Sequence, residues 1–128
     1  MPILECHDVS KHFGGLAALT DVNLSVQEGE VLGLIGPNGA GKTTLFNVIS
    51  AAFPPKSGSI RFKGKNITGL KPYQICRMGM ARTFQSVKIF RDMTVLQNVA
   101  LGCCFGKKKK VTSDAAKQDA SELLEFVG

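Results

Sequence analysis

The 128-residue sequence has no tryptophan, one tyrosine and two histidines, and its four cysteines show no C-x-x-C spacing. His7 and His12 lie near only Cys6, so neither a zinc site nor a disulfide framework is expected. The sequence does not open with a charged segment followed by an apolar one, as a signal peptide would. We therefore expect the protein to lie in the reducing cytosol. The longest apolar runs are far shorter than the about 18 residues of a membrane-spanning helix. We therefore expect no direct membrane insertion, and a membrane role only through a partner.

Acidic residues are scarce: 10 Asp and Glu stand against 16 Lys and Arg, which gives a net charge of +6. Residues 107–110 supply four lysines in one run, for which a solvated loop is favoured over contact with lipid or nucleic acid. The phenylalanines fall at core spacing and do not interleave with basic residues, so a nucleic-acid partner is not expected. A hydrophobic content of 44% at this length predicts one core and one folded unit.

Residues 36–43 read G-P-N-G-A-G-K-T and fit the G-x-x-x-x-G-K-[ST] phosphate loop, directly after the apolar run 31–35. Glycines let successive N–H groups converge on a phosphate, Lys42 can reach the terminal phosphates, and Thr43 can offer its hydroxyl to Mg²⁺. A helix over 42–50 would point its N-terminal dipole at the same anion. The pattern predicts nucleotide binding, and a Gly-rich turn that matches by chance is the alternative.

Alternating and helical periodicity predict the other elements. Strands are expected at 3–9, 22–26, 60–62 and 80–84, with 31–35 as the strand of the phosphate loop. A short helix is expected at 71–78. Another helix should start at Thr94, whose spacing to Gln97 fits a capping box, and helical spacing recurs over 116–127. The short alternating strands predict an antiparallel sheet beside a parallel one.

Two further phrases follow the loop in order: A-R-T-F-Q at 81–85 and M-T-V-L-Q-N-V at 93–99. With them the sequence resembles an ABC transporter ATPase. Among such proteins it is most similar to the subunits that power import of branched-chain amino acids, in four phrases: F-G-G-L-A-A-L, G-P-N-G-A-G-K-T-T-L-F-N-V-I, R-M-G-M-A-R-T-F-Q and F-R-D-M-T-V-L-Q-N-V. The likeness covers nearly the whole chain and is weakest over 103–111.

The resemblance implies an α/β fold: a partial P-loop NTPase core of the ABC ATPase type, with an antiparallel β subdomain and the start of a helical subdomain. Residues 1–128 would form a single partial nucleotide-binding domain. Within it, 1–93 would hold the phosphate-loop core with the antiparallel β subdomain, and 94–128 the start of the helical subdomain. The protein would be the N-terminal part of a subunit that couples ATP binding and hydrolysis to amino-acid uptake. Its partners would be transmembrane permease subunits and a second ATP-binding subunit, at the inner, cytoplasmic face of the cell membrane.

Roles follow at matched positions. Phe13 would stack on adenine, although a core or turn phenylalanine is the alternative. Residues 86–93 resemble the surface that receives a helix of the membrane subunit. Lys42 and Gln85 would act in catalysis, and Thr43 and Gln85 would bind Mg²⁺. For Gln85 the alternative is an exposed amide without a role. The ATP-binding residues would be Phe13, Gly36, Asn38, Gly39, Ala40, Gly41, Lys42, Thr43 and Thr44.

The family's signature motif, its second acidic motif with the catalytic glutamate, and its switch histidine do not occur in this sequence. No acidic residue closes an apolar strand after the phosphate loop. Whether the chain is an enzyme is therefore open, and we expect it to bind ATP without turning it over. Other readings are the ATPase of another ABC transporter, for urea or for export, and a stand-alone P-loop kinase or nucleotide-binding module. A GTPase is disfavoured because no N-K-x-D occurs.

Overall fold

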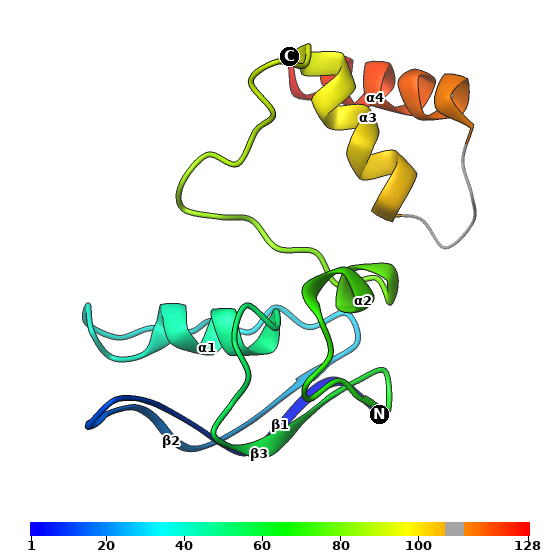
Figure 1. The fold of residues 1–128 in the computed structure, drawn as a ribbon. Coiled ribbons are helices and arrows are strands. Elements are labelled where there is room, and N and C mark those ends of the chain that lie inside the picture. The colour runs from blue at the N-terminus through cyan, green and yellow to red at the C-terminus, as the bar shows by residue number, and fades with distance from the viewer. Residues whose placement is uncertain (107–111) are drawn as a thin grey trace. The chain divides into compact units, whose positions relative to one another are not determined.

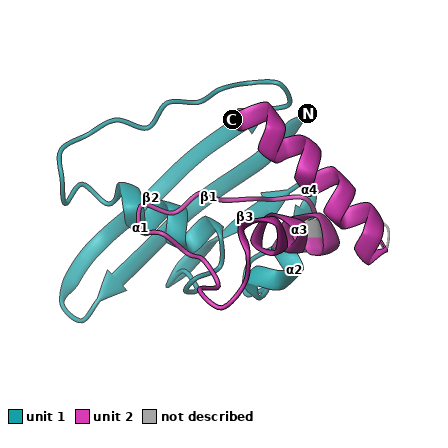
Figure 2. Cartoon of the chain, turned by 90° about the horizontal axis from the view of Figure 1, so that it is seen from above, with its two compact units in different colours: residues 1–75 teal, residues 76–128 magenta. Residues whose placement is uncertain are grey.

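The computed structural model describes residues 1–106 and 112–128 (Figure 1). They form two compact units, Met1–Ile75 and Cys76–Gly128, and the division falls inside α2 (Pro72–Arg77) (Figure 2). The predicted division into a core with its β subdomain (1–93) and the start of a helical subdomain (94–128) stays a prediction. The lysine run 107–110 lies outside the described residues.

The first unit is built on one antiparallel sheet with the strand order β2-β1-β3-β4. The strands are β1 (Pro2–Phe13), β2 (Leu16–Gln27), β3 (Ser57–Phe62) and β4 (Lys65–Asn66). Helix α1 (Lys42–Ile49) buries Leu45 and Val48, as its apolar spacing predicts. The β1–β2 hairpin turns at residues 14–15 and pairs Phe13 with Leu16, which brings both to one end of the sheet. The fully buried side chains of this unit are Cys6, Val9, Ile60 and Ile67.

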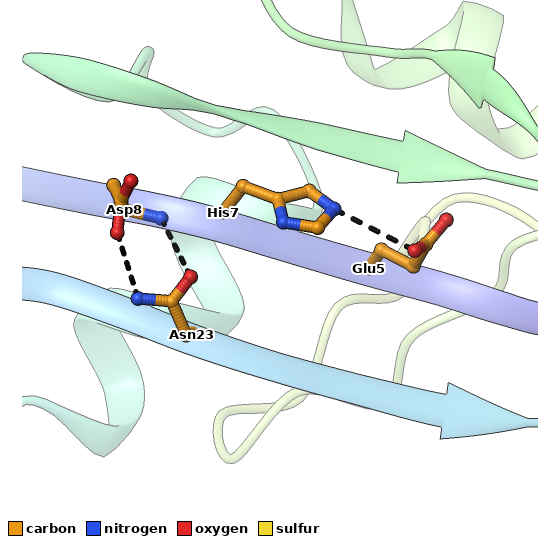
Figure 3. A network of polar contacts seen from close by, with 4 residues as sticks. All are labelled: Glu5, His7, Asp8 and Asn23. Atoms are coloured by element: carbon orange, nitrogen blue, oxygen red, sulfur yellow. Dashed lines mark hydrogen bonds and ion pairs between the residues drawn. The ribbon is translucent and has the colours of Figure 1, made fainter.

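Strand β1 carries a bulge at Asp8, where φ is 49° and the pairing register shifts. The Asn23 side chain on β2 replaces the interrupted ladder: its Oδ1 accepts from the Asp8 N–H (3.1 Å), and its Nδ2 donates to Asp8 Oδ1 (2.8 Å) (Figure 3). One residue earlier on β1, His7 Nε2 lies 3.5 Å from Glu5 Oε1. On the other side of β1, Gly58 approaches so closely that a Cβ there would lie 2.4 Å from the Asp8 carbonyl oxygen. The bend of β1 therefore depends on a glycine in β3.

Two predicted strands are wrong. Residues 31–35 and 80–84 form no strand, and among the described residues no segment pairs with either of them. An extended segment becomes a strand only when a neighbour completes its hydrogen bonds. Residues 31–35 still keep the side-chain alternation of a strand, since Val31 and Ile35 are 96% and 94% exposed while Leu32 and Leu34 border an apolar hollow. The expected parallel sheet is therefore absent from the part of the chain that the structure describes.

The second unit contains α3 (Val95–Gly106) and α4 (Ser113–Val127). The predicted capping box is confirmed: Thr94 N donates to Gln97 Oε1 (2.9 Å) and Gln97 N donates to Thr94 Oγ1 (3.1 Å). The helices meet through small side chains, and the buried cluster is Ala100, Cys103, Ala116 and Ala120. Leu123 and Val127 are more than half exposed, so the apolar face expected for the last helix is only partly covered. No helix in the described ranges is long and apolar enough to cross a bilayer.

Candidate functional site

The phosphate loop owes its shape to two left-handed glycines, Gly39 with φ 86° and Gly41 with φ 94°. A turn inside the loop is closed by Ala40 N, which donates to Pro37 O at 3.2 Å. Gly41 also lies against the hairpin, because a Cβ at this position would be 2.6 Å from the Ala18 carbonyl oxygen. Lys42 folds back over the loop, and its Nζ donates to the Gly36 carbonyl oxygen. A phosphate could compete for the same ammonium group.

Helix α1 begins at Lys42, within the last residues of the loop, with no side-chain cap and no acidic residue in its first turn. Its first intrahelical bond is donated by Leu45 N to Gly41 O (2.8 Å). The preceding N–H groups of the first turn are left without helical partners, and the partial positive charge of the helix is concentrated there. Thr43 and Thr44 lie in this turn. The arrangement suits a bound anion, with a hydroxyl beside it for a metal ion.

A hollow of about 390 Å³ joins the phosphate loop to the tip of the β1–β2 hairpin. Its size falls within the range of about 300–1,000 Å³ that is usual for ligand pockets. One end is polar and glycine-rich, and the other is apolar with an aromatic ring. The lining residues are Phe13, Leu16, Ala17, Ala18, Asn38, Gly39, Gly41, Lys42, Thr43 and Thr44. Phe13 is 46% exposed, which leaves part of its ring available for stacking.

Seven of the nine predicted nucleotide-binding residues thus line one hollow, and the other two do not. Gly36 and Ala40 do not line the hollow: Gly36 receives the Lys42 ammonium, and a Cβ on it would lie 3.4 Å from the Ala40 Cβ. The sequence interpretation missed the apolar lining by Leu16, Ala17 and Ala18. Gly14 and Gly15, directly after Phe13, carried the necessary signal, because a hairpin that turns there returns the next residues to a position opposite Phe13.

Gln85 belongs to the second unit, where it is exposed and lies in a bend. Neighbouring Phe84 has the Arg82 guanidinium 4.8 Å and Lys88 Nζ 5.9 Å from its ring centroid. Among the described residues, no group of three or more His, Cys, Asp or Glu side chains could hold a metal ion. The roles of Thr43 and Gln85 at Mg²⁺ stay predictions.

Comparison with known proteins connects this chain to one family. A family model described as ABC transporter matches residues 19–128. The chain belongs to the ABC transporter family. Members of this family bind nucleotide, and the residues of the phosphate loop lie within the matched range.

Several ABC relatives have names that specify branched-chain amino acid transport. A high-affinity branched-chain amino acid transport ATP-binding protein of Pseudomonas aeruginosa is 48% identical over 98 residues, which are 77% of this chain and 38% of that protein. A probable branched-chain amino acid transport ATP-binding protein of Methanocaldococcus jannaschii is 36% identical over 99% of this chain and 53% of its own length. The chain therefore spans between about a third and a half of these relatives.

Solved ABC cassettes share the fold. A crystal structure described as the ADP conformation of an ATP-binding cassette of an ABC transporter superposes with a TM-score of 0.83 at 36% identity, over 99% of this chain and 54% of that one. A dimeric bacterial ABC transporter cassette gives a TM-score of 0.83 at 25% identity, over 96% of this chain and 56% of that one. The expected ABC ATPase fold, present in part, is confirmed.

Proposed function

We propose that this chain is the ATP-binding, N-terminal part of an ABC importer subunit that couples ATP binding and hydrolysis to the uptake of branched-chain amino acids. The observation that carries the proposal is the hollow that joins Phe13 to the phosphate loop. An aromatic ring next to a phosphate-binding nest fits a nucleotide, because the base is flat and apolar on its faces whereas the phosphates need N–H donors and a cation.

The proposed contacts divide by chemistry. Gly36, Asn38, Gly39, Ala40 and Gly41 shape or supply the backbone nest, and Phe13 stacks on adenine. Lys42 moves from the Gly36 carbonyl to the terminal phosphates, where it offsets negative charge. Thr43 offers its hydroxyl to Mg²⁺, Thr44 adds a second hydroxyl beside the phosphates, and Gln85 approaches the metal or the attacking water in the complete subunit. When bound with the nucleotide, Mg²⁺ would neutralise charge between the phosphates.

The transported solute is inferred from the relatives, whose names specify branched-chain amino acids. Transport requires membrane subunits, and we propose that permease subunits dock on residues 86–93. In this segment Val87, Ile89 and Phe90 are 80%, 61% and 62% exposed, and Lys88 and Arg91 lie between or beside them. A second ATP-binding subunit would complete the assembly at the inner face of the membrane. The alternatives of urea transport, export or a free-standing kinase have no observation in their favour.

Isothermal titration of the chain with ATP and Mg²⁺ tests the proposal. We expect Lys42→Ala to weaken binding at least about tenfold, since a charge-assisted hydrogen bond to phosphate is worth about 1.5–3 kcal/mol. Lys65→Ala is the matched control, because this exposed lysine on β4 lies outside the hollow and its loss changes the net charge equally. Equal affinities of the unaltered chain and Lys42→Ala would contradict the proposal.

A further inference from the structure

The ring of Phe13 contacts two residues, Lys11 and Phe53, that do not line the hollow. Phe53 meets it edge to face, with ring centroids 5.5 Å apart and an interplanar angle of 87°. Lys11 Nζ lies 5.4 Å from the centroid of Phe13 and 5.4 Å from that of Phe53. Phe13 borders the hollow whereas Lys11 and Phe53 do not. The cation and the second ring therefore contact Phe13 from outside the space that a nucleotide would fill.

Both supporting residues are themselves anchored. Lys11 is half-buried and stands two positions before Phe13 on β1, so their side chains leave the strand on the same side. Phe53 is half-buried in the connection from α1 to β3, and it also borders a smaller hollow lined by core residues Val48, Ile60 and Ile67. That connection is tied to β1 by Lys56 N, which donates to Ser10 O at 2.7 Å. The support is thus continuous with the core of the sheet.

We propose that Lys11 and Phe53 are positioning residues for the base of the nucleotide, acting through Phe13. The inference rests on the proposed function, in which Phe13 stacks on adenine. An exposed phenylalanine that rotates freely loses rotamer freedom when a base binds, and a ring already fixed by neighbours avoids that loss. The faces of the Phe13 ring and of the base are both electron-rich, so they repel each other when they stack. The Lys11 cation near one face of the Phe13 ring reduces this repulsion at the other face.

The test compares ATP with inorganic tripolyphosphate, which offers phosphates and no base. Lys11→Met keeps an unbranched side chain that reaches the Cε position and removes the charge, and we expect it to weaken ATP binding about two- to fivefold. Phe53→Leu keeps apolar volume and removes the ring, and we expect a loss of about three- to tenfold. Tripolyphosphate affinity should change by less than about twofold in both variants, because the phosphate loop is untouched. Lys11→Arg retains the cation and should retain ATP affinity.

A double-mutant cycle with Phe13→Ala separates positioning from a general defect of the fold. If Lys11 and Phe53 act through Phe13, neither Lys11→Met nor Phe53→Leu should weaken ATP binding further once Phe13 is alanine. The inference is overturned by unchanged ATP affinity in the single variants, by equal losses for ATP and tripolyphosphate, or by losses that persist without Phe13. Failure of the proposed function has a different signature: the unaltered chain would not bind ATP, or Lys42→Ala would bind as well as the unaltered chain.

Discussion

The side chain of Asn98 on α3 binds both polar groups of the Phe90 main chain. Asn98 Oδ1 accepts from Phe90 N at 2.9 Å, and Asn98 Nδ2 donates to Phe90 O at 3.1 Å. The same Nδ2 also reaches the carbonyl oxygens of Met93 (3.2 Å) and Thr94 (2.9 Å). One amide therefore holds the segment that leads into the helix and that we propose as the permease-docking surface.

Asn98→Ala should release this segment while leaving α3 in place. Each lost hydrogen bond is worth about 0.5–1.5 kcal/mol, and we expect about 1–2 kcal/mol of local stability to be lost because water can replace part of the set. Hydrogen exchange at the Phe90 amide and tryptic cleavage after Arg91 should both accelerate. Gln118→Ala is the control, since it removes an exposed amide on α4, whose Nε2 donates to Glu122 Oε1 at 3.3 Å. Unchanged exchange at Phe90 would show that Asn98 does not hold the segment.

Gly41→Ala should damage the phosphate loop by two separable effects. The substitution places a Cβ 2.6 Å from the Ala18 carbonyl oxygen and imposes a φ of 94° on a non-glycine residue. We expect a loss of about 2–3 kcal/mol in the free energy of unfolding, together with loss of nucleotide binding.

Gly64→Ala isolates the backbone effect in the same experiment. Gly64 has φ 77°, lies outside the hollow and has no atom within 4 Å of an added Cβ. Gly64→Ala should therefore lower the free energy of unfolding by about 1 kcal/mol and leave nucleotide binding unchanged. Chemical denaturation and calorimetry measure both quantities, and equal stability losses in the two variants would argue against the contact between the loop and the hairpin.

The stability of the first unit should fall at high pH because of Cys6. This thiol is 1% exposed, and burial raises its pKa from an ordinary 9.0 to about 11. Below pH 9 the Cys6 thiol keeps its proton in both the folded and the unfolded chain, so its contribution to stability is fully present. As the pH rises toward 11 the unfolded chain loses the proton first, and up to about 2–3 kcal/mol of stability is lost.

Urea unfolding of the unaltered chain and of Cys6→Ala across this range isolates the thiol from tyrosine and lysine titration. The alanine variant should be less stable at pH 8 because of the cavity, and its stability should fall less steeply as the pH rises. Curves that fall in parallel for the two proteins would assign the pH dependence to other groups.

The 128-residue chain should self-associate through residues 31–35. Their main chain has no strand partner among the described residues, and Val31 and Ile35 are almost fully exposed. Unpaired extended segments with apolar side chains recruit other chains. Val31→Lys combined with Ile35→Lys should reduce the scattered-light mass and change the unfolding free energy by less than about 0.5 kcal/mol per site. Leu34→Lys is the contrasting control, because it faces the apolar hollow and should destabilise the fold. A clean monomer of the unaltered chain would contradict this prediction.

We expect no ATP turnover by this chain above background. Mg²⁺ and the attacking water need carboxylates, and the sequence has no acidic residue closing an apolar strand after the phosphate loop. Gln85→Ala should consequently be silent in a phosphate-release assay. Phosphate release that Lys42→Ala abolishes would show that the 128 residues suffice for chemistry.

Local interactions explain what the sequence by itself determined. The phosphate loop, the start of α1, the capping box of Thr94 and Gln97 and the hairpin turn after Phe13 all depend on residues within a few positions of one another. Backbone preference and short-range hydrogen bonds decide such features before any long-range contact forms. The family resemblance likewise rests on contiguous motifs, which is why it could be recognised from the sequence.

Only the tertiary structure decided which distant residues serve the hollow and which apolar segments become strands. Nothing in the spacing of Lys11, Phe13 and Phe53 shows that a ring 40 positions away meets the hairpin tip edge to face. The apolar run 31–35 reads as a strand, yet a strand is defined by its partner's hydrogen bonds, and among the described residues that partner is absent. Side-chain alternation survives without the partner because it needs only an extended backbone, whereas the ladder needs a second chain segment at about 4.8 Å.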